Sequence, residues 1–345
     1  MDDIQTLIGR VIPEMKGLFE KRYNILRVIY ANQPVGRRTL SCILGVGERI
    51  IRSDTAVLKE TGLIDIRPAG MFLTKEGEEL LDKLREYAGA LGGLNELELK
   101  LKEILGISRA IVVPGELDSD PSVLGAMGKA ASVLLESMLT DGVKIAVTGG
   151  SSVAAAASAM TRHRTYSDIL VLPARGGIGR EVEHQSNTLA AVFAKKLGGQ
   201  YRLLHLPDQL TIEAAESLLN DSYTRSVIDD VKKADILVCG VGIAAEMALK
   251  RNLSAEQIEA LRREGAVAEA FGYYFDSKGE IILATSTIGL DIEDLKSIPR
   301  VVGIAGGRQK AQAISAVLTG WRNCTLVTDE SAAREILNLS TGRNA

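Results

Sequence analysis

From Ala110 to the C-terminus the chain repeats one pattern, in which a short apolar run is followed by a glycine-rich turn and a helical segment. Alternation of strands and helices at this spacing predicts an α/β domain with a parallel, doubly wound sheet. Runs that are apolar throughout, such as 169–172, are typical of strands covered by helices on both faces. The expected strands are Ala110–Pro114, Lys144–Val147, Ile169–Pro173, Tyr201–Leu206, Ile236–Val241, Val301–Ala305 and Thr325–Thr328. The expected helices between them are 122–139, 151–160, 184–198, 211–219, 308–318 and 331–337.

The N-terminal part of the chain has a different pattern, composed of helices. Apolar residues at helical spacing predict helices at 4–18 and 19–31, with a kink or boundary at Pro13. Residues 37–44 and 48–61 are then expected to form two helices joined by a tight turn that contains two glycines. Helix, short turn and helix is the pattern of a helix-turn-helix motif.

A β-hairpin is expected directly after this motif. Residues 63–67 and 71–73 are predicted to form two strands on either side of a Pro-Ala-Gly turn. Thr74 is placed to cap a further helix that ends near Tyr87, and 88–96 is expected to be a linker. A helix-turn-helix followed by a hairpin predicts a winged helix-turn-helix domain.

Charge is distributed unevenly between the two parts of the chain. Residues 1–75 hold 12 Lys and Arg against 8 Asp and Glu, a net charge of +4, while the whole chain has −3, which leaves −7 for the remainder. A basic head on an acidic body favours a DNA-binding module joined to a second function. We therefore divide the chain into a winged helix-turn-helix DNA-binding domain at 1–90 and an α/β domain at 91–345.

The second helix of a helix-turn-helix enters the major groove, where exposed basic and polar side chains contact bases and phosphates. Arg49 and Arg52 lie on this helix and suit guanine edges or phosphates. The candidate DNA-binding residues are Arg37, Arg38, Arg49, Arg52, Ser53, Thr55 and Arg67. Each arginine alone can equally be a solvated charge, and such a domain can also serve as a protein-interaction module. The complete helix, turn, helix and hairpin favours double-stranded DNA as the partner.

Several classes of site are excluded by what the sequence lacks. The three cysteines, Cys42, Cys239 and Cys324, form no CxxC pair, and only three histidines occur, so we expect no disulfide framework, no metal site and a reducing compartment. Neither GxGxxG nor GxxxxGK[ST] occurs cleanly, which argues against a dinucleotide or ATP cofactor. The N-terminus lacks a signal-peptide pattern and no apolar run has the length of a membrane span, so a cytoplasmic protein without a membrane partner is expected.

Four glycine-rich turns follow expected strands, at the edge of a parallel sheet where ligands bind. These turns are 148–152, 173–180, 240–242 and 305–310. In the first, two glycines let a ligand approach the backbone and the N–H groups of the next helix suit an anion. A plain strand-to-helix turn is the alternative.

Cations lie in or after the other three turns. Arg175 suits a bidentate phosphate contact, and the Lys250-Arg251 pair suits a second phosphate. Lys310 opens a helix, where a cation opposes the helix dipole unless an anion is bound. For each of these residues a solvated charge or a surface salt bridge is the alternative. Glu269 precedes a run of aromatic residues that we expect in the core or a dimer interface, and it suits sugar hydroxyls.

Six blocks of the sequence resemble the SorC-type sugar-binding transcriptional regulators, in the same order along nearly the whole chain. The blocks are Arg37–Glu60, VTGGSS at 147–152, VLPARGGIG at 171–179, YRLLHLPDQL at 201–210, AVAEAFGYYF at 266–275 and VVGIAGGRQKAQAI at 301–314. The resemblance implies a C-terminal domain related to sugar-phosphate isomerases that serves as a sensor, with no cofactor. It implies a homo-oligomer, a dimer or tetramer, that represses glycolytic genes and responds to fructose 1,6-bisphosphate or a related sugar phosphate.

The same resemblance assigns residues to the effector site. These are Thr148, Gly149, Gly150, Ser151, Ser152, Arg175, Gln185, Lys250, Arg251, Glu269 and Lys310. The chain departs from the family pattern where Ser151 and Ser152 replace two threonines, and where Lys250 replaces an arginine. Because lysine lacks the guanidinium fork, a bisphosphate and a monophosphate both stay open as effector.

An enzyme is the alternative to a regulator: a sugar-phosphate isomerase with an accessory N-terminal domain. Such an enzyme needs a positioned acid and base in its pocket. Glu269 and His184 are the candidates, and the sequence contains no evident residue that would orient either of them.

Overall fold

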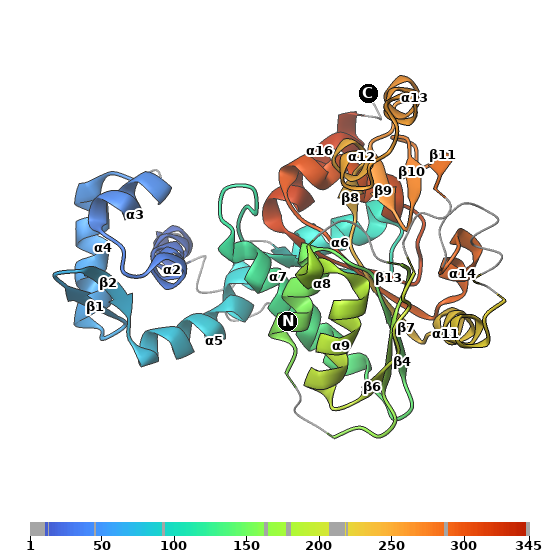
Figure 1. The fold of residues 1–345 in the computed structure, drawn as a ribbon. Helices are drawn as coiled ribbons and strands as arrows, with labels where there is room; N and C mark the ends of the chain where they lie inside the picture. Colours follow the sequence, from blue (N-terminus) through green and yellow to red (C-terminus); the bar gives the residue numbers. More distant parts are fainter. Residues whose placement is uncertain are drawn as a thin grey trace. The chain divides into compact units, whose positions relative to one another are not determined.

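The computed structural model describes residues 11–12, 14–44, 46–91, 94–161, 165–176, 181–206, 218, 220–285 and 289–342. The chain divides into two compact units, Met1–Asn95 and Glu96–Ala345, which are described separately (Figure 1). Most of the helix expected at 4–18 and nearly all of that expected at 211–219 lie outside the described residues. Within the described part of the chain, no helix has the length and apolar character needed to cross a membrane.

The first unit contains the helix, turn, helix and hairpin that its sequence predicts. Its core joins apolar side chains of all its helices and both strands, among them the fully buried Ile25, Ile29, Leu40 and Ile51. The strands pair antiparallel, with Ile64 opposite Leu73. The elements are α2 (Glu14–Asn32), α3 (Arg37–Leu44), α4 (Glu48–Glu60), β1 (Ile64–Arg67), β2 (Gly70–Leu73) and α5 (Lys75–Leu91).

Two expected boundaries in this unit are wrong. Helix α2 runs unbroken through 18–19, where the sequence suggested a division between two helices. Helix α5 continues to Leu91 and so includes the first residues of the expected linker at 88–96. Ala88, Ala90 and Leu91 are strong helix formers, which favours continuation of the helix despite Gly89. The expected cap of α5 is present, since the Gly77 N–H donates to Thr74 Oγ1 at 3.0 Å.

A buried carboxylate fixes the orientation of α4. Asp54 is 4% exposed and accepts from Arg22 Nε at 3.3 Å, with Lys21 Nζ at 2.5 Å; both cations belong to α2. Ile51 and Leu58 are buried on the same side of α4. The opposite side of α4, with Arg49 and Arg52, is therefore exposed.

The second unit is built on a seven-stranded sheet in the order β3-β13-β12-β7-β4-β5-β6, in which every neighbouring pair is parallel. The strands are β3 (Arg109–Val113), β4 (Lys144–Val147), β5 (Leu170–Pro173), β6 (Gln200–Tyr201), β7 (Ile236–Cys239), β12 (Arg300–Ile304) and β13 (Cys324–Asp329). This is the parallel α/β sheet that the sequence predicts. The strand expected at 201–206 is wrong in extent, because β6 pairs only with Leu170 and Val171 at the edge of the sheet.

Helices cover both faces of this sheet (Figure 1). Apolar residues of α7 (Ser122–Met138), α8 (Ser151–Ala159) and α9 (Ser186–Leu197) form one core with inward residues of the sheet such as Ile145, Val171 and Val302. Helix α11 (Ser222–Lys232) contacts β4 and β5, and Leu318 of α15 (Ala311–Leu318) lies against Gly303 of β12. Helices α6 (Leu94–Leu105) and α16 (Glu330–Gly342) also accompany this sheet.

The chain reverses direction across the sheet beside β4. It builds β4, β5 and β6 outward in one direction and then places β7 on the other side of β4. This makes the edge between the carboxyl ends of β4 and β7 a topological switch point, which is where open α/β sheets bind ligands.

A second, antiparallel sheet follows β7 directly, and the sequence did not predict it. Its order is β11-β10-β9-β8, and its strands are β8 (Gly242–Ile243), β9 (Ala268–Ala270), β10 (Tyr273–Phe275) and β11 (Ile281–Ala284). Helices α12 (Ala244–Lys250), α13 (Ala255–Arg263) and α14 (Ile292–Ser297) accompany it. Tyr274 is fully buried against α12 and α13 residues, so the aromatic run forms a core.

The close packing of α7 on α8 gives a test of the fold. A Cβ at Gly128 would lie 2.6 Å from the backbone O of Ala155, whereas Gly125, on the same helix, has nothing within 4 Å. Gly128→Ala should therefore lower the free energy of unfolding by about 1–3 kcal/mol. Gly125→Ala should leave it equal or raise it by up to about 1 kcal/mol, because alanine favours the helix. Thermal unfolding measures both, and equal effects of the two substitutions would contradict this packing.

Candidate functional site

A cavity of about 490 Å³ opens at the switch point, between the carboxyl ends of the central strands and the antiparallel sheet. This volume is in the range of small-molecule sites. The eleven residues expected to bind an effector all line it: Thr148, Gly149, Gly150, Ser151, Ser152, Arg175, Gln185, Lys250, Arg251, Glu269 and Lys310. The fold thus brings together residues from three of the expected turns, and from α12 and β9, that are far apart in sequence.

The turn at 148–152 places the N-terminus of α8 on the cavity. One of its two glycines, Gly149, has a role that the sequence did not suggest. A Cβ at Gly149 would lie 2.5 Å from the backbone O of His184, and the Gly150 N–H donates to the same oxygen at 2.9 Å. Gly149 therefore makes room for the chain before α9, while the start of α8 faces the cavity.

One buried carboxylate connects two arginines that line the cavity and come from different elements. Glu269 Oε1 accepts from Arg251 Nη2 at 2.6 Å and lies 3.6 Å from Arg175 Nη1; all three side chains are at most 5% exposed. Since a buried charge is costly unless it is paired, each of these groups depends on the others. Oε1 of Glu269 thus binds protein groups, and the expected role of this residue as a partner of sugar hydroxyls stays a prediction.

The hairpin between β9 and β10 holds Glu269 in place. Phe271 and Gly272 have φ of 57° and 82°, as a two-residue type I′ hairpin turn requires. The Gly272 N–H donates to Glu269 Oε1 at 2.7 Å, and the ring of Phe271 stacks on Trp321 with centroids 6.0 Å apart.

Lys310 reaches the cavity from the short 3₁₀ turn η2 (Arg308–Lys310), which precedes α15. Burial lowers the pKa of its ammonium, Glu246 raises it, Lys250 lowers it and Asp118 raises it, in decreasing order of effect. The net result is a pKa below the usual value for lysine. A bound anion such as a phosphate would favour the charged form of the Lys310 ammonium.

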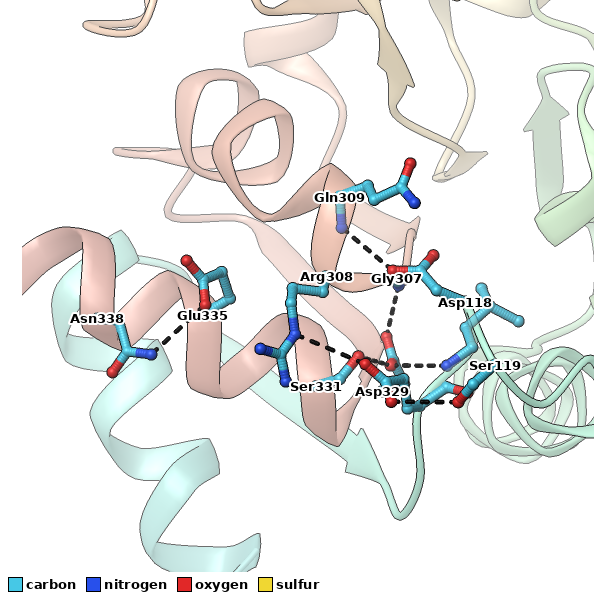
Figure 2. A network of polar contacts seen from close by, with 11 residues as sticks. Asp118, Ser119, Gly307, Arg308, Gln309, Asp329, Ser331, Glu335 and Asn338 are labelled. Carbon is cyan, nitrogen blue, oxygen red and sulfur yellow. Dashed lines mark hydrogen bonds and ion pairs between the residues drawn. The ribbon is translucent and has the colours of Figure 1, made fainter. Parts of the chain in front are cut away.

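Carboxylates of the protein accept hydrogen bonds from the backbone just before Lys310 (Figure 2). Buried Asp329 accepts from the N–H of Gly307 at 2.7 Å and of Leu117 at 3.1 Å, and Asp118 accepts from the Gln309 N–H at 3.2 Å. These N–H groups of the turn at 305–310 are therefore committed to the protein, and the side chain of Lys310 is what this turn offers to the cavity.

The remaining cations differ in exposure. Lys250 is exposed on α12, and Arg251, at the C-cap of that helix, is committed to Glu269. Glu181 faces this region: a hydrogen bond from His184 is the main cause that lowers its pKa, and Lys250 lowers it further. His184 Nδ1 lies 2.8 Å from Glu181 Oε2 at the rim of the cavity. Among the described residues, no cluster of His, Cys, Asp and Glu could hold a metal ion.

Six of the seven expected DNA-binding residues are exposed in the first unit: Arg37, Arg38, Arg49, Arg52, Ser53 and Arg67. Arg37 and Arg52 line a shallow hollow together with Lys59, which the sequence did not single out. Arg67 pairs with Asp65 at 2.7 Å and lies over the ring of Phe72.

Thr55 is the exception. It is 1% exposed, and its hydroxyl donates to the backbone O of Ile51 at 2.7 Å, although it also lines the hollow beside Arg52. Its contact with DNA stays a prediction. Asp54 and Thr55 are both buried on the inward side of α4. Because both side chains are polar, the pattern of apolar residues in the sequence did not predict their burial.

Both units match known protein families. Residues 90–338 match the family described as a sugar-binding domain, and residues 18–88 match the CggR N-terminal DNA-binding domain. The chain is 42% identical over 329 residues to the central glycolytic genes regulator of Priestia megaterium (strain DSM 319 / IMG 1521), covering 95% of this chain and 96% of the relative. The protein of the same name from Bacillus subtilis (strain 168) is 40% identical over 328 residues, with the same coverage.

Solved structures of similar proteins support the same family assignment. A protein described as a SorC-family transcriptional regulator from Enterococcus faecalis is 40% identical and superposes with a TM-score of 0.66, covering 70% of this chain and 99% of that one. The chain belongs to the SorC-type family of sugar-binding transcriptional regulators. The full-length sorbitol operon regulator SorC from Klebsiella pneumoniae shares the fold at 20% identity, with a TM-score of 0.65 over 92% of this chain and 98% of that one.

Membership in the SorC-type family decides between the two functions that the sequence left open. The two relatives at 42% and 40% identity and the Enterococcus faecalis protein are transcriptional regulators, which confirms the expectation of a regulator rather than an enzyme. The first unit is a DNA-binding domain and the second a sugar-binding domain.

The buried Arg251–Glu269 pair predicts a strong dependence of stability on one carboxylate. Glu269→Gln should lower the free energy of unfolding by about 3 kcal/mol, because it leaves two buried guanidinium groups without their common counter-charge. Glu246→Gln is the matched control on the same cavity; its side chain is exposed, so we expect a change within about 0.5 kcal/mol. Urea unfolding measures both, and a Glu269→Gln variant as stable as its control would rule out the buried ion pair.

The exposed face of α4 predicts which substitutions weaken DNA binding. Arg52→Ala should reduce affinity about tenfold for a duplex selected by the parent protein from random sequences, because it removes a base or phosphate contact. Lys83→Ala, a surface cation on α5 outside the motif, should change affinity less than about twofold. Fluorescence anisotropy at fixed salt measures both. Unchanged affinity after Arg52→Ala would remove Arg52 from the interface.

Proposed function

We propose that the chain is a repressor of glycolytic genes whose operator binding is controlled by fructose 1,6-bisphosphate. The similarity to two central glycolytic genes regulators, at 42% and 40% identity over nearly the full length, supports the glycolytic target. The distribution of cations around the cavity is the observation that supports fructose 1,6-bisphosphate as the effector.

The cationic groups are spread along the edge of the sheet. Lys310 follows β12 and Arg175 follows β5, three strand positions apart, which corresponds to about 14 Å at the usual strand spacing. The N-terminus of α8 lies between them, after β4. A ligand with two separated phosphates matches this spread better than a monophosphate does. Lys250 contributes a point charge where an arginine would grip a phosphate with two hydrogen bonds, so a monophosphate is the natural competitor.

Control of the operator requires that the effector bind two states of the protein with different affinity. We infer that the sugar-binding unit forms a homo-oligomer, a dimer or tetramer, that presents several DNA-binding units to one operator. The effector then changes operator affinity by favouring one arrangement of the oligomer.

Ligand-dependent thermal unfolding of the full chain tests the proposed effector. Fructose 1,6-bisphosphate at about one hundred times its Kd stabilises the folded state by about 2.7 kcal/mol, which should raise the Tm by about 5 °C. Fructose 6-phosphate at the same concentration should give a smaller rise, and Lys310→Met should reduce the rise with fructose 1,6-bisphosphate more than the rise with fructose 6-phosphate. A larger rise with the monophosphate would reassign the effector, and no rise with any sugar phosphate would refute the proposed sensor.

A further inference from the structure

Two carboxylates that lie outside the expected effector set are placed near Lys310 by different elements. Glu246 lies on α12 and lines the cavity, and Asp118 lies in the loop between β3 and α7. Both raise the pKa of Lys310 against the lowering effect of burial, with Glu246 the stronger. An acid beside a cation that is meant for phosphate opposes phosphate binding by direct repulsion.

The position of Asp118 is built into the fold. Its Oδ2 accepts from the Gln309 N–H at 3.2 Å (Figure 2). The N–H of the neighbouring Leu117 donates to buried Asp329 at 3.1 Å. Gly307 has φ of 96°, and a Cβ there would lie 2.5 Å from Asp118 Oδ1. Only glycine therefore allows this carboxylate to approach the turn that carries Lys310.

Glu246 is placed independently of Asp118. It precedes Lys250 by four residues on α12, so both side chains lie on one side of that helix, and both line the cavity. Glu246 is exposed, which means that its charge can act on a ligand without supporting the core.

We propose that Glu246 and Asp118 are specificity-determining residues that oppose the charge of Lys310 and thereby weaken the binding of a phosphate at that end of the cavity. This inference rests on the proposed function, in which an anionic sugar phosphate is the effector. The two acids penalise a bisphosphate more than a monophosphate that occupies only the turn at 148–152. They raise the effector concentration at which the regulator responds.

Calorimetric titration of the full chain tests this proposal with three probes: inorganic phosphate, fructose 6-phosphate and fructose 1,6-bisphosphate. Glu246→Gln and Asp118→Asn keep the size of each side chain and its capacity to accept a hydrogen bond. Each should tighten fructose 1,6-bisphosphate binding about three- to tenfold, as expected for one charge acting on a dianion across several ångströms of hydrated cavity. The gain for fructose 6-phosphate should be smaller.

Two further variants separate a local effect from general electrostatics. Glu181→Gln removes a charge from the rim beside His184 and Lys250, and should tighten binding less than Glu246→Gln does. In a Lys310→Met background, Glu246→Gln and Asp118→Asn should lose most of their effect, because their partner is gone. Unliganded thermal unfolding verifies that each variant is folded.

The outcomes distinguish this proposal from the function on which it rests. Wild-type affinity for fructose 1,6-bisphosphate in both variants, or a gain equal to that of Glu181→Gln, overturns the proposal while the effector site stands. Weaker sugar-phosphate binding after Glu246→Gln overturns it in favour of a carboxylate that binds sugar hydroxyls. If neither the wild type nor any variant binds any of the three probes, both the effector site and its counter-charges are refuted.

Discussion

The sugar-binding unit depends on the buried contact between Glu269 and the guanidinium groups of Arg251 and Arg175. Arg175 follows β5 of the parallel sheet, Glu269 belongs to β9 of the antiparallel sheet, and Arg251 ends α12. One carboxylate thus joins two sheets across the switch point. Because each buried charge requires the others, the cavity walls are held at a fixed separation before any ligand arrives, and the ordering cost of binding is reduced.

The four glycine-rich turns serve different purposes although their sequences look alike. The turn at 148–152 places the N-terminus of α8 on the cavity. In the turn at 305–310, by contrast, backbone N–H groups donate to Asp329 and Asp118, and the side chain of Lys310 lines the cavity. The site therefore combines one helix terminus with side-chain cations. Under the proposed function, this division lets the sheet edge hold a ligand with two anionic ends, and the two acids that we propose to oppose the charge of Lys310 limit its affinity.

The sequence predicted what depends on local patterns. Residues 37–44 and 48–61 match α3 and α4 closely, and continuous apolar runs located the strands of the parallel sheet. It missed what depends on contacts between distant residues. The antiparallel sheet has strands of two to four residues, too short for a periodic signal. The burial of Thr55, the pairing of Glu269 and the position of Asp118 beside Lys310 follow from tertiary packing, which spacing along one chain does not contain.

The central claim is that one sugar phosphate spans the cavity between the N-terminus of α8 and Lys310. A crystal structure of the full chain grown with fructose 1,6-bisphosphate tests it most directly. The account predicts one phosphate at the turn formed by 148–152, the other on the side of Lys310, and an intact contact between Arg251 and Glu269. A bisphosphate bound outside this cavity, or bound with that contact broken, would contradict the account.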